Sequence, residues 1–310
     1  MHALINAKPG SPGTPPLRHG WKVLLALPAI FVLTLVAISA TTAWRAVSVV
    51  RPPRLGIDSL EIERELPTAQ PISFLGPDGA TLAGDFVAPK NGAAIVLVHG
   101  LFANRQQLLP EAQLLAARGY GVLIFDNRAH GESGGTTATW GLRESEDVAR
   151  AVDFVQQRTQ LPAGRIGLLG LSIGGTAVLR EAVGDSRIGA IVVESTYSSM
   201  GGEIEYMFGR YGPFSKLPAL WTAQVVGGLD YAQLVPEKIL CALQSRPLLL
   251  IYGSDDSDVP LGEGKRMAEA ACRPDALLVI NGGRHGGFLQ ADAQTYSERL
   301  LAFLDAALLP

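Results

Sequence analysis

Cysteine, charge and acidic residues near the N-terminus are all scarce in this chain of 310 residues. Its two cysteines, Cys241 and Cys272, exclude a disulfide-rich scaffold and a cysteine-based zinc site. Charged residues make up 18% of the chain, below the ~25% usual for a soluble domain. Apolar residues make up 47%, which excludes a disordered or collagen-like protein and indicates that part of the chain is unusually apolar.

Acidic residues are absent before Asp58, whereas residues 1–54 carry six basic residues. The remaining 256 residues hold 20 basic and 29 acidic residues, a net charge of −9. The net charge of −3 for the whole chain therefore averages two different parts. An acidic body of this kind gives no reason to expect a nucleic-acid partner.

An uncharged run, VLLALPAIFVLTLVAISATTA, occupies residues 23–43. As a helix it would be roughly 30 Å long, enough to cross the apolar core of a bilayer. Trp21 and Lys22 precede the run, and Trp44 and Arg45 follow it, as is typical of membrane interfaces. We expect a single-pass transmembrane helix acting as an uncleaved signal anchor, with a disordered basic tail over residues 1–22 and a linker over residues 44–60.

Two other interpretations of this run stay open. It could be a buried core helix, or a signal peptide cleaved near Thr41-Thr42-Ala43. Three basic residues precede the run and three follow it, so charge alone does not orient it. The order of a charged segment before the apolar run favours a cytoplasmic N-terminus and an extracytoplasmic body. If the run is only a tether, deletion of residues 1–50 should leave a soluble, active protein.

From about residue 60, short β-branched runs alternate with stretches of helical periodicity. Strands are expected over residues 94–98, 121–125, 166–169, 190–193, 248–252 and 276–280, and helices over 108–118, 143–158 and 176–183. Parallel neighbours need crossover helices, so an α/β domain with a mostly parallel sheet and helices on both faces is predicted for residues 61–310. Pro77-Asp78-Gly79 indicates a turn, which predicts an antiparallel hairpin over residues 72–87.

Residues 197–245 interrupt this alternation of strands and helices. They contain many aromatic residues, with glycine and proline between them. We expect a small helical insertion that can form a lid over a site at the carboxyl edge of the sheet. The alternative is a packed surface excursion without a role at a site.

A serine motif, Gly170-Leu-Ser172-Ile-Gly174, follows one predicted strand and precedes a helix. This is the context that a nucleophile elbow requires, because small residues let the backbones approach and the serine then projects from a tight turn. The amide of Ile173 should point into the same space from a helix N-terminus. A second match around Ser133 lies in a polar loop without that context, so we interpret Ser133 as a loop residue.

A serine nucleophile needs a base, and His285 is the only histidine downstream of Ser172. It lies in a glycine-rich loop, GGRHGG, after the last predicted strand. An acid to orient it is expected between the two, where Asp255, Asp256 and Asp258 follow the strand over 248–252. Spacing alone does not choose among these three carboxylates.

The turn after the strand over 94–98 reads His99-Gly100-Leu101-Phe102. We expect a backbone N–H group of this turn to be the second hydrogen-bond donor of an oxyanion hole. Leu101 is preferred to Phe102 as the residue that supplies it. We interpret His99 as a residue that stabilises the turn and not as the catalytic base.

With these segments in order, the sequence resembles the α/β-hydrolase superfamily, and most closely its membrane-anchored esterase and serine-aminopeptidase-like branch. The resemblance covers about residues 72–308. It depends on LVHGLFAN, FDNRAHGESGG, LGLSIGG, ESTYSS, LIYGSDDSDVP and GGRHGGFL.

This resemblance implies catalytic roles for Ser172 and His285, favours Asp256 as the acid, and implies a lid over residues 197–245. The chain departs from the family at Ala129, where relatives usually carry glycine, which puts only the geometry of that loop in doubt. Relatives that dehalogenate or open epoxides use aspartate at the elbow, so Ser172 implies acyl transfer to water.

We therefore expect a membrane-bound serine hydrolase that acts on a small-molecule ester or thioester, with an apolar acyl group favoured by the aromatic insertion. A serine peptidase with the same triad and a non-catalytic binding module are the alternatives. No cofactor or metal is expected, because metal, phosphate-loop and dinucleotide motifs are absent from the sequence. The sequence predicts neither the oligomeric state nor whether Cys241 and Cys272 pair.

Overall fold

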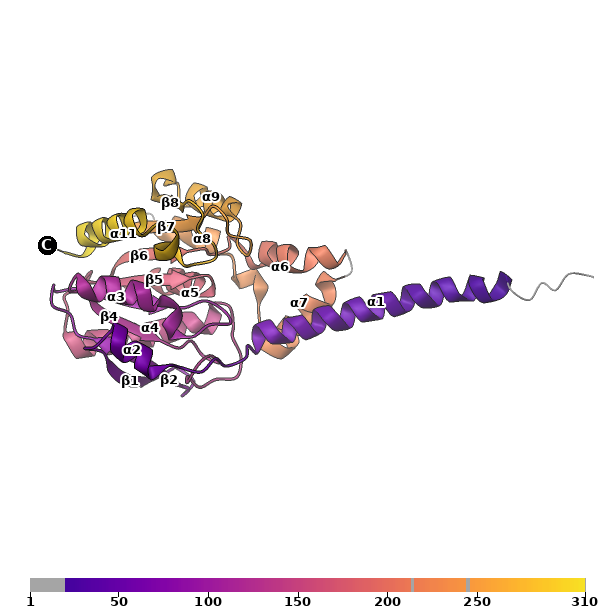
Figure 1. Ribbon diagram of the computed structural model, residues 1–310, viewed down its shortest axis with the longest axis horizontal. Helices are drawn as coiled ribbons and strands as arrows, with labels where there is room; N and C mark the ends of the chain where they lie inside the picture. Colours follow the sequence, from indigo (N-terminus) through magenta and orange to yellow (C-terminus); the bar gives the residue numbers. More distant parts are fainter. Residues whose placement is uncertain (1–19, 213–214, 244–245, 310) are drawn as a thin grey trace, which may run out of the picture.

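The computed structural model describes residues 20–212, 215–243 and 246–309, so most of the expected tail lies outside the described residues. Its centre is an eight-stranded sheet of order β1-β2-β4-β3-β5-β6-β7-β8 (Figure 1). The strands are β1 (Gln70–Leu75), β2 (Thr81–Val87), β3 (Ala94–Val98), β4 (Gly121–Phe125), β5 (Ile166–Leu171), β6 (Ile188–Glu194), β7 (Leu248–Gly253) and β8 (Leu277–Ile280).

The hairpin of β1 and β2 is antiparallel, β2 also pairs antiparallel with β4, and the other neighbours are parallel. Each strand expected from an apolar run is present, with ends that differ by a few residues at most. The predicted mostly parallel sheet is therefore confirmed.

Helices cover both faces of the sheet, because its strands are apolar on both sides. In β3, Val96 and Val98 belong to one apolar cluster, whereas Ile95 and Leu97 belong to another. The first cluster packs against α4 (Leu142–Thr159), α5 (Ile173–Ala182), α8 (Pro236–Leu240) and α9 (Leu261–Ala270). The second packs against α2 (Ser59–Glu65), α3 (Leu109–Ala117), α10 (Phe288–Ala291) and α11 (Ala293–Leu308).

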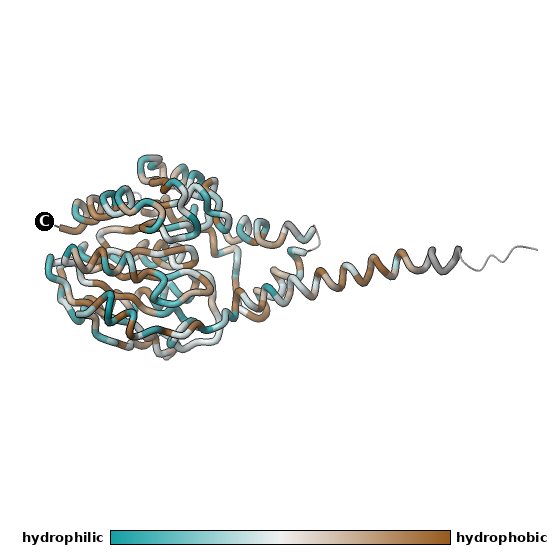
Figure 2. The backbone as a smooth tube through the Cα atoms, in the orientation of Figure 1, coloured by the Kyte–Doolittle hydropathy of each residue, from teal (hydrophilic) through white to brown (hydrophobic). Residues whose placement is uncertain are grey.

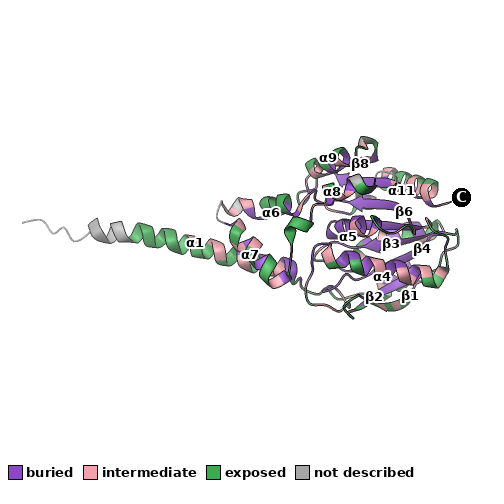
Figure 3. Ribbon diagram, turned by 180° about the vertical axis from the view of Figure 1, so that it is seen from behind, coloured by how far each residue is buried: buried purple, intermediate pink, exposed green. Residues whose placement is uncertain are grey.

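Helix α1 (Gly20–Val50) extends away from the sheet as one long apolar rod (Figures 1 and 2). Its apolar part, Ala26–Val50, is long enough to span a membrane or to be a signal sequence, and only 6% of the most apolar window is buried. Figure 3 shows this exposure along most of the helix. Because a core helix would be buried, the core-helix interpretation of this run is wrong.

The last turns of α1 belong to the body, which corrects the expected linker over residues 44–60. The helix continues to Val50 and ends before Pro52 and Pro53, since a proline disfavours the helical conformation of the residue that precedes it. Helix α2 then begins at Ser59, capped by the Asp58 side chain. The connection between the two helices is thus residues 51–58.

The insertion between β6 and β7 is helical, as expected. It contains α6 (Met200–Phe208), α7 (Lys216–Gly227) and α8, joined by short 3₁₀ turns η2 (Gly209–Tyr211), η3 (Tyr231–Gln233) and η4 (Cys241–Leu243). Helix α7 lies alongside the body end of α1 (Figures 1 and 3). A third apolar cluster joins α1, α6 and α7 above the carboxyl edge of the sheet, with Ala46, Val49 and Val50 buried in it.

Candidate active site

Ser172 occupies the turn between β5 and α5 with φ 56° and ψ −118°, a strained conformation for a residue with a side chain. Two hydrogen bonds hold the turn. Its N–H donates to the Glu194 carbonyl over 2.8 Å, and its carbonyl accepts from the Thr196 hydroxyl over 2.8 Å. Both partners come from the end of β6, so the neighbouring strand fixes this turn.

Glycine is required on both sides of Ser172. A Cβ on Gly170 would lie 2.3 Å from the Gly174 carbonyl oxygen, and one on Gly174 would lie 2.2 Å from the Val98 carbonyl oxygen. Both distances are far inside van der Waals contact. The motif therefore has its physical basis in the close approach of α5 to β5 and β3.

His285 lies in the loop after β8, and Asp256 in the loop after β7. The Nδ1 atom of His285 lies 3.0 Å from Oδ2 of Asp256, whose side chain is fully buried. The other carboxylate oxygen of Asp256 accepts the N–H groups of Asp258 and Val259 over 2.9 and 2.8 Å. This arrangement directs the Nδ1 proton of a neutral imidazole to the carboxylate and leaves Nε2 available as a base.

The His285–Asp256 pair also shifts both pKa values. Burial alone would raise the pKa of Asp256, but the hydrogen bond and charge of His285, helped by the Val259 N–H, hold it below its ordinary value. Burial opposes the charged form of His285, but the hydrogen bond and charge of Asp256, with Asp258 and Glu203 nearby, raise its pKa above the ordinary value. The pair therefore favours an ionised carboxylate beside a base.

Of the three candidate acids, only Asp256 is bonded to His285 among the described residues. Asp255 is exposed and accepts from the Ser254 hydroxyl over 2.7 Å. Asp258 is exposed at the rim of the cavity. The geometry thus agrees with the choice that the family resemblance implies.

Two backbone N–H groups beside the cavity have no hydrogen-bond partner among the described residues. Neither the N–H of Ile173 nor that of Leu101 donates a hydrogen bond to any described residue, and both residues line the same cavity as Ser172. The loop of Leu101 approaches closely, because a Cβ on Gly100 would lie 3.3 Å from the Ser172 Cβ. Phe102, the second candidate, has φ 58°. Free amides in these positions are what an oxyanion hole needs.

A cavity of about 540 Å³ connects Ser172 with His285. Its walls are largely apolar and come from the 99–102 loop, the 257–259 loop, α1 and α6. Residues not predicted from the sequence also line it, namely Arg45, Ser48, Val49, Trp140, Glu203, Met207 and Phe208.

Glu203 on α6 is a buried carboxylate in this largely apolar cavity. Burial raises its pKa to about 7; His285 opposes that shift, and the neighbouring carboxylates Glu263, Asp258 and Asp256 add to it. The sequence carried no signal for this residue, because a single glutamate within the insertion resembles any solvated helix charge.

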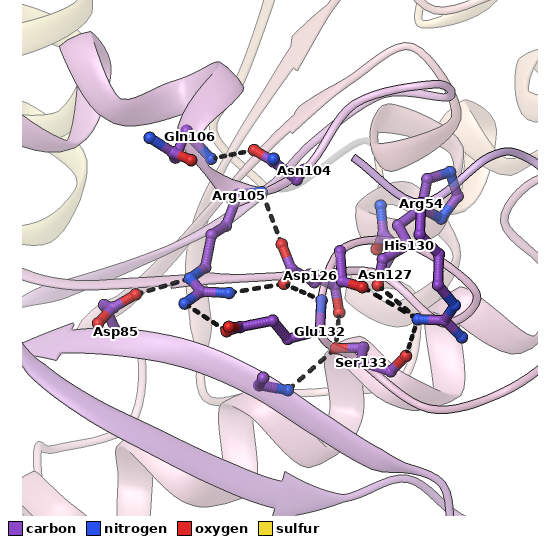
Figure 4. Close-up of polar contacts among 12 residues, drawn as sticks. Arg54, Asp85, Asn104, Arg105, Gln106, Asp126, Asn127, His130, Glu132 and Ser133 are labelled. Atoms are coloured by element: carbon purple, nitrogen blue, oxygen red, sulfur yellow. Dashed lines mark hydrogen bonds and ion pairs between the residues drawn. The ribbon is translucent and has the colours of Figure 1, made fainter. Parts of the chain in front are cut away.

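A network of ion pairs holds the loop that follows the Leu101 turn. Figure 4 shows Arg105 at its centre, with bonds of 2.6 Å to Asp85, 2.6 Å to Asp126 and 2.9 Å to Glu132. Arg105 is buried in η1 (Arg105–Leu108), so its charge is balanced by neighbouring carboxylates. The network ties this loop to the ends of β2 and β4.

Figure 4 also shows the hydrogen bonds that hold the loop around Ser133. Arg54, just beyond α1, donates to the carbonyls of His130, Gly131, Ser133 and Gly135 (Figure 4). The Ser133 hydroxyl donates to the Asp126 carbonyl over 2.6 Å and accepts the Ala83 N–H over 2.9 Å. Ser133 is thus a structural loop residue, as expected.

His99 is also structural. Its Nδ1 lies 2.7 Å from the Gly100 carbonyl, and its Nε2 accepts the Asn127 N–H over 2.9 Å. Burial and the neighbouring His130 lower its pKa to about 3, so it is neutral. Ala129, the position at which the sequence departs from the expected motif, adopts φ 63°, in the left-handed region that favours glycine. Cys272 is an exposed free thiol, and the side chain of Cys241 lies outside the described residues.

The chain matches a family model described as "Alpha/beta hydrolase family" over residues 95–298, and it belongs to this family. The resemblance to the α/β-hydrolase superfamily inferred from the motifs is thereby confirmed. Membership in this family, together with the fold, makes the protein an α/β hydrolase.

Relatives cover most of the domain. The chain is 28% identical over 255 residues to the uncharacterized protein YfhR of Escherichia coli K12, covering 78% of this chain and 83% of YfhR. It is 31% identical over 144 residues to the thiohydrolase aneE of Aspergillus aculeatus, covering 44% and 45%. The solved esterase Pf2001 of Pyrococcus furiosus has the same fold, with a TM-score of 0.69, 24% identity, and coverage of 84% and 100%.

Proposed function

We propose that the protein is a membrane-bound serine hydrolase that cleaves a carboxylic ester or thioester through an acyl-enzyme. One observation carries the proposal. A serine on a strained strand–helix turn lines the same cavity as a histidine bonded to a buried aspartate. The name of the relative aneE, a thiohydrolase, favours thioesters within this class.

In the proposed mechanism, the Ser172 hydroxyl attacks the carbonyl carbon while His285 Nε2 takes its proton. Asp256 holds the imidazole and stabilises the imidazolium. The N–H groups of Ile173 and Leu101 donate to the tetrahedral oxyanion. Collapse of the intermediate expels the alcohol or thiol, which receives the proton from His285. Water then attacks the acyl-enzyme with His285 as base, releasing the acid and free Ser172.

A membrane attachment through α1 is part of the proposal, with the body on the extracytoplasmic side. The length and apolar exposure of α1 support it. The basic residues of the segment 1–54 contrast with the net charge of −9 on the rest and agree with a membrane-proximal arm.

A fluorophosphonate probe tests the nucleophile, because it phosphonylates an activated serine. Wild-type protein should be labelled, and Ser172→Ala should not. Ser133→Ala is the matched control, since Ser133 occupies the other G-x-S-x-G sequence, and it should still be labelled. Absence of labelling in the wild type would favour a non-catalytic binding module, and labelling that persists in Ser172→Ala would overturn Ser172 as the nucleophile.

The role of Asp256 as the triad acid is tested by measuring ester hydrolysis. Asp256→Asn should lower kcat for a p-nitrophenyl ester by about 10³–10⁴-fold, because the imidazole loses its orientation. Asp255→Asn and Asp258→Asn should stay within about tenfold of wild type, as neither is bonded to His285. Parallel assays on thioesters and aminoacyl amides separate the proposed activity from a peptidase.

A further inference from the structure

Helix α1 leads directly from its apolar run into the wall of the catalytic cavity. Arg45, Ser48 and Val49 line that cavity together with Ser172. At ~1.5 Å per residue, Val49 lies only about 10 Å along the helix from residue 43, where the uncharged run ends. A headgroup layer has a similar thickness, so α1 places the cavity at the membrane surface.

The lid also lies against the apolar run. Tyr211, in η2 before α7, forms a groove with the segment of α1 that runs from Ile30 to Thr41. At the other end of α7, Gly227 lies against Val50, where a Cβ would approach Val50 Cγ1 to 2.7 Å. Helix α7 therefore lies along α1, with its first turn toward the membrane (Figure 1).

The outer face of α7 is apolar and exposed. Leu217, Trp221 and Val225, spaced by four residues, are 72%, 67% and 61% exposed, while Ala219 and Ala223 are buried on the inner side. Trp44, at the end of the apolar run of α1, is 70% exposed. Tryptophan and aliphatic side chains on such a face are typical of helices that lie in a membrane interface.

We infer that the exposed face of α7 contacts the bilayer beside α1 and that the cavity takes its substrate from the membrane, as an ester or thioester whose acyl chain is dissolved in the bilayer. The substrate class rests on the proposed function. The acyl chain passes between α1 and the lid, where Arg45 and Tyr211 meet through a hydrogen bond. A soluble short-chain ester reaching Ser172 from water is the competing possibility.

Membrane contact of α7 is measured on the full chain in phosphatidylcholine vesicles. Both native cysteines are first replaced, by Cys241→Ser and Cys272→Ser, so that only an introduced cysteine is labelled. A nitroxide is attached at Leu217→Cys, and its collisions with oxygen and with an aqueous nickel complex are compared by electron paramagnetic resonance. Oxygen should dominate at this position. The control is Leu60→Cys on α2, 73% exposed in the native chain, where nickel should dominate. Equal accessibility to nickel at both positions overturns the inference.

Substrate delivery is tested with Leu217→Ser/Trp221→Ser/Val225→Ser, three surface changes that do not touch the cavity. Hydrolysis of 4-methylumbelliferyl oleate in the vesicles should fall about tenfold, because the lid loses its membrane contact. Hydrolysis of water-soluble p-nitrophenyl butyrate should stay within about twofold. The control Leu60→Ser/Leu75→Ser should change neither rate.

Equal loss of both rates, or of neither, overturns membrane delivery. Failure of the proposed function has a different signature. In that case wild-type protein hydrolyses neither ester and Ser172 is not labelled by fluorophosphonate, while the nitroxide still reports where α7 lies.

Discussion

Glu203 is the residue whose charge bears most directly on the base. It lines the cavity with His285, and its negative charge is one of the causes that raise the pKa of His285. Since the pKa of Glu203 itself is raised to about 7, the carboxyl gains its charge in the same pH range in which a histidine loses its proton. The two groups therefore titrate together.

Glu203→Gln should shift the acidic limb of the pH profile of kcat/KM to lower pH. The base works only when His285 is neutral, so activity rises as pH passes the pKa of His285. Removing a nearby negative charge destabilises the imidazolium and lowers that pKa. Glu205→Gln, an exposed change on the same helix that removes an ion pair with Lys216, should leave the limb in place. A limb that moves to higher pH contradicts this role for Glu203.

Individual site residues differed in how far sequence could predict them. Ser172 and His285 depend on local motifs and chain order, both of which a sequence displays. The choice of Asp256 needed a family resemblance, because three carboxylates share one loop and only side-chain direction separates them. Glu203 and Arg45 reach the cavity through tertiary packing of the lid and α1, which leaves no local pattern.

At the scale of elements, α1 is both a membrane-spanning candidate and a part of the α/β-hydrolase domain. The Val49 carbonyl accepts the indole N–H of Trp140 over 3.1 Å, and the Val50 carbonyl accepts the Ala138 N–H over 2.8 Å. Hydropathy alone placed the end of the helix near residue 43, because Trp44 and Arg45 resemble an interface. The helix continues beyond residue 43 because residues 44–51 contain neither proline nor glycine.

Two truncations separate the tether from the cavity wall. Deletion of residues 1–43 keeps Ala46, Val49 and Val50 and should yield a protein active on water-soluble esters. Deletion of residues 1–50 removes these buried side chains and should lower the free energy of unfolding by about 3–5 kcal/mol. It should also lower kcat/KM at least about tenfold, since a wall of the cavity is lost.

This outcome reverses the expectation of a mere tether, on which deletion of residues 1–50 leaves full activity. Urea unfolding and p-nitrophenyl butyrate hydrolysis measure both effects. If the two truncated proteins are equally stable and equally active, the last turns of α1 have no role in the site.

The strands of the sheet were more predictable than the lid. A strand buried on both faces is a continuous apolar run, and such runs appear directly in the sequence. The internal order of α6, α7 and α8 depends on packing against α1 and the sheet edge. Composition indicated that the insertion is helical and aromatic, but not which of its helices packs against α1.

Among the described residues, three apolar clusters have different roles. Two lie on either side of the sheet, and the third joins the lid to α1 above the carboxyl edge of the sheet. The scarcity of charge in the sequence thus has two physical causes, an exposed apolar helix and a doubly covered sheet. The third cluster packs the end of the apolar helix α1 against the carboxyl edge of the sheet.

One buried polar group inside this fold should make stability depend on pH. Glu194 ends β6, and its carboxyl accepts the hydroxyl of Tyr296 on α11, in fully buried surroundings. Burial and the neighbouring Glu111 raise its pKa to about 8, against 4.5 ordinarily. Between these values the folded chain keeps a proton that the unfolded chain releases, so stability falls as pH rises, by at most about 1.4 kcal/mol per pH unit for one group.

Glu194→Gln should flatten this dependence, because the amide keeps an acceptor for Tyr296 and has no proton to lose. The free energy of unfolding, measured in urea at pH 5.5 and pH 8.5, should fall more for wild type than for the variant. Glu298→Gln, an exposed change on α11, should behave as wild type. A variant that loses as much stability as wild type over this range would mean that Glu194 is already ionised in the folded protein. The Ser172 N–H donates to the Glu194 backbone carbonyl, so the same ionisation would then lie directly beneath the nucleophile turn.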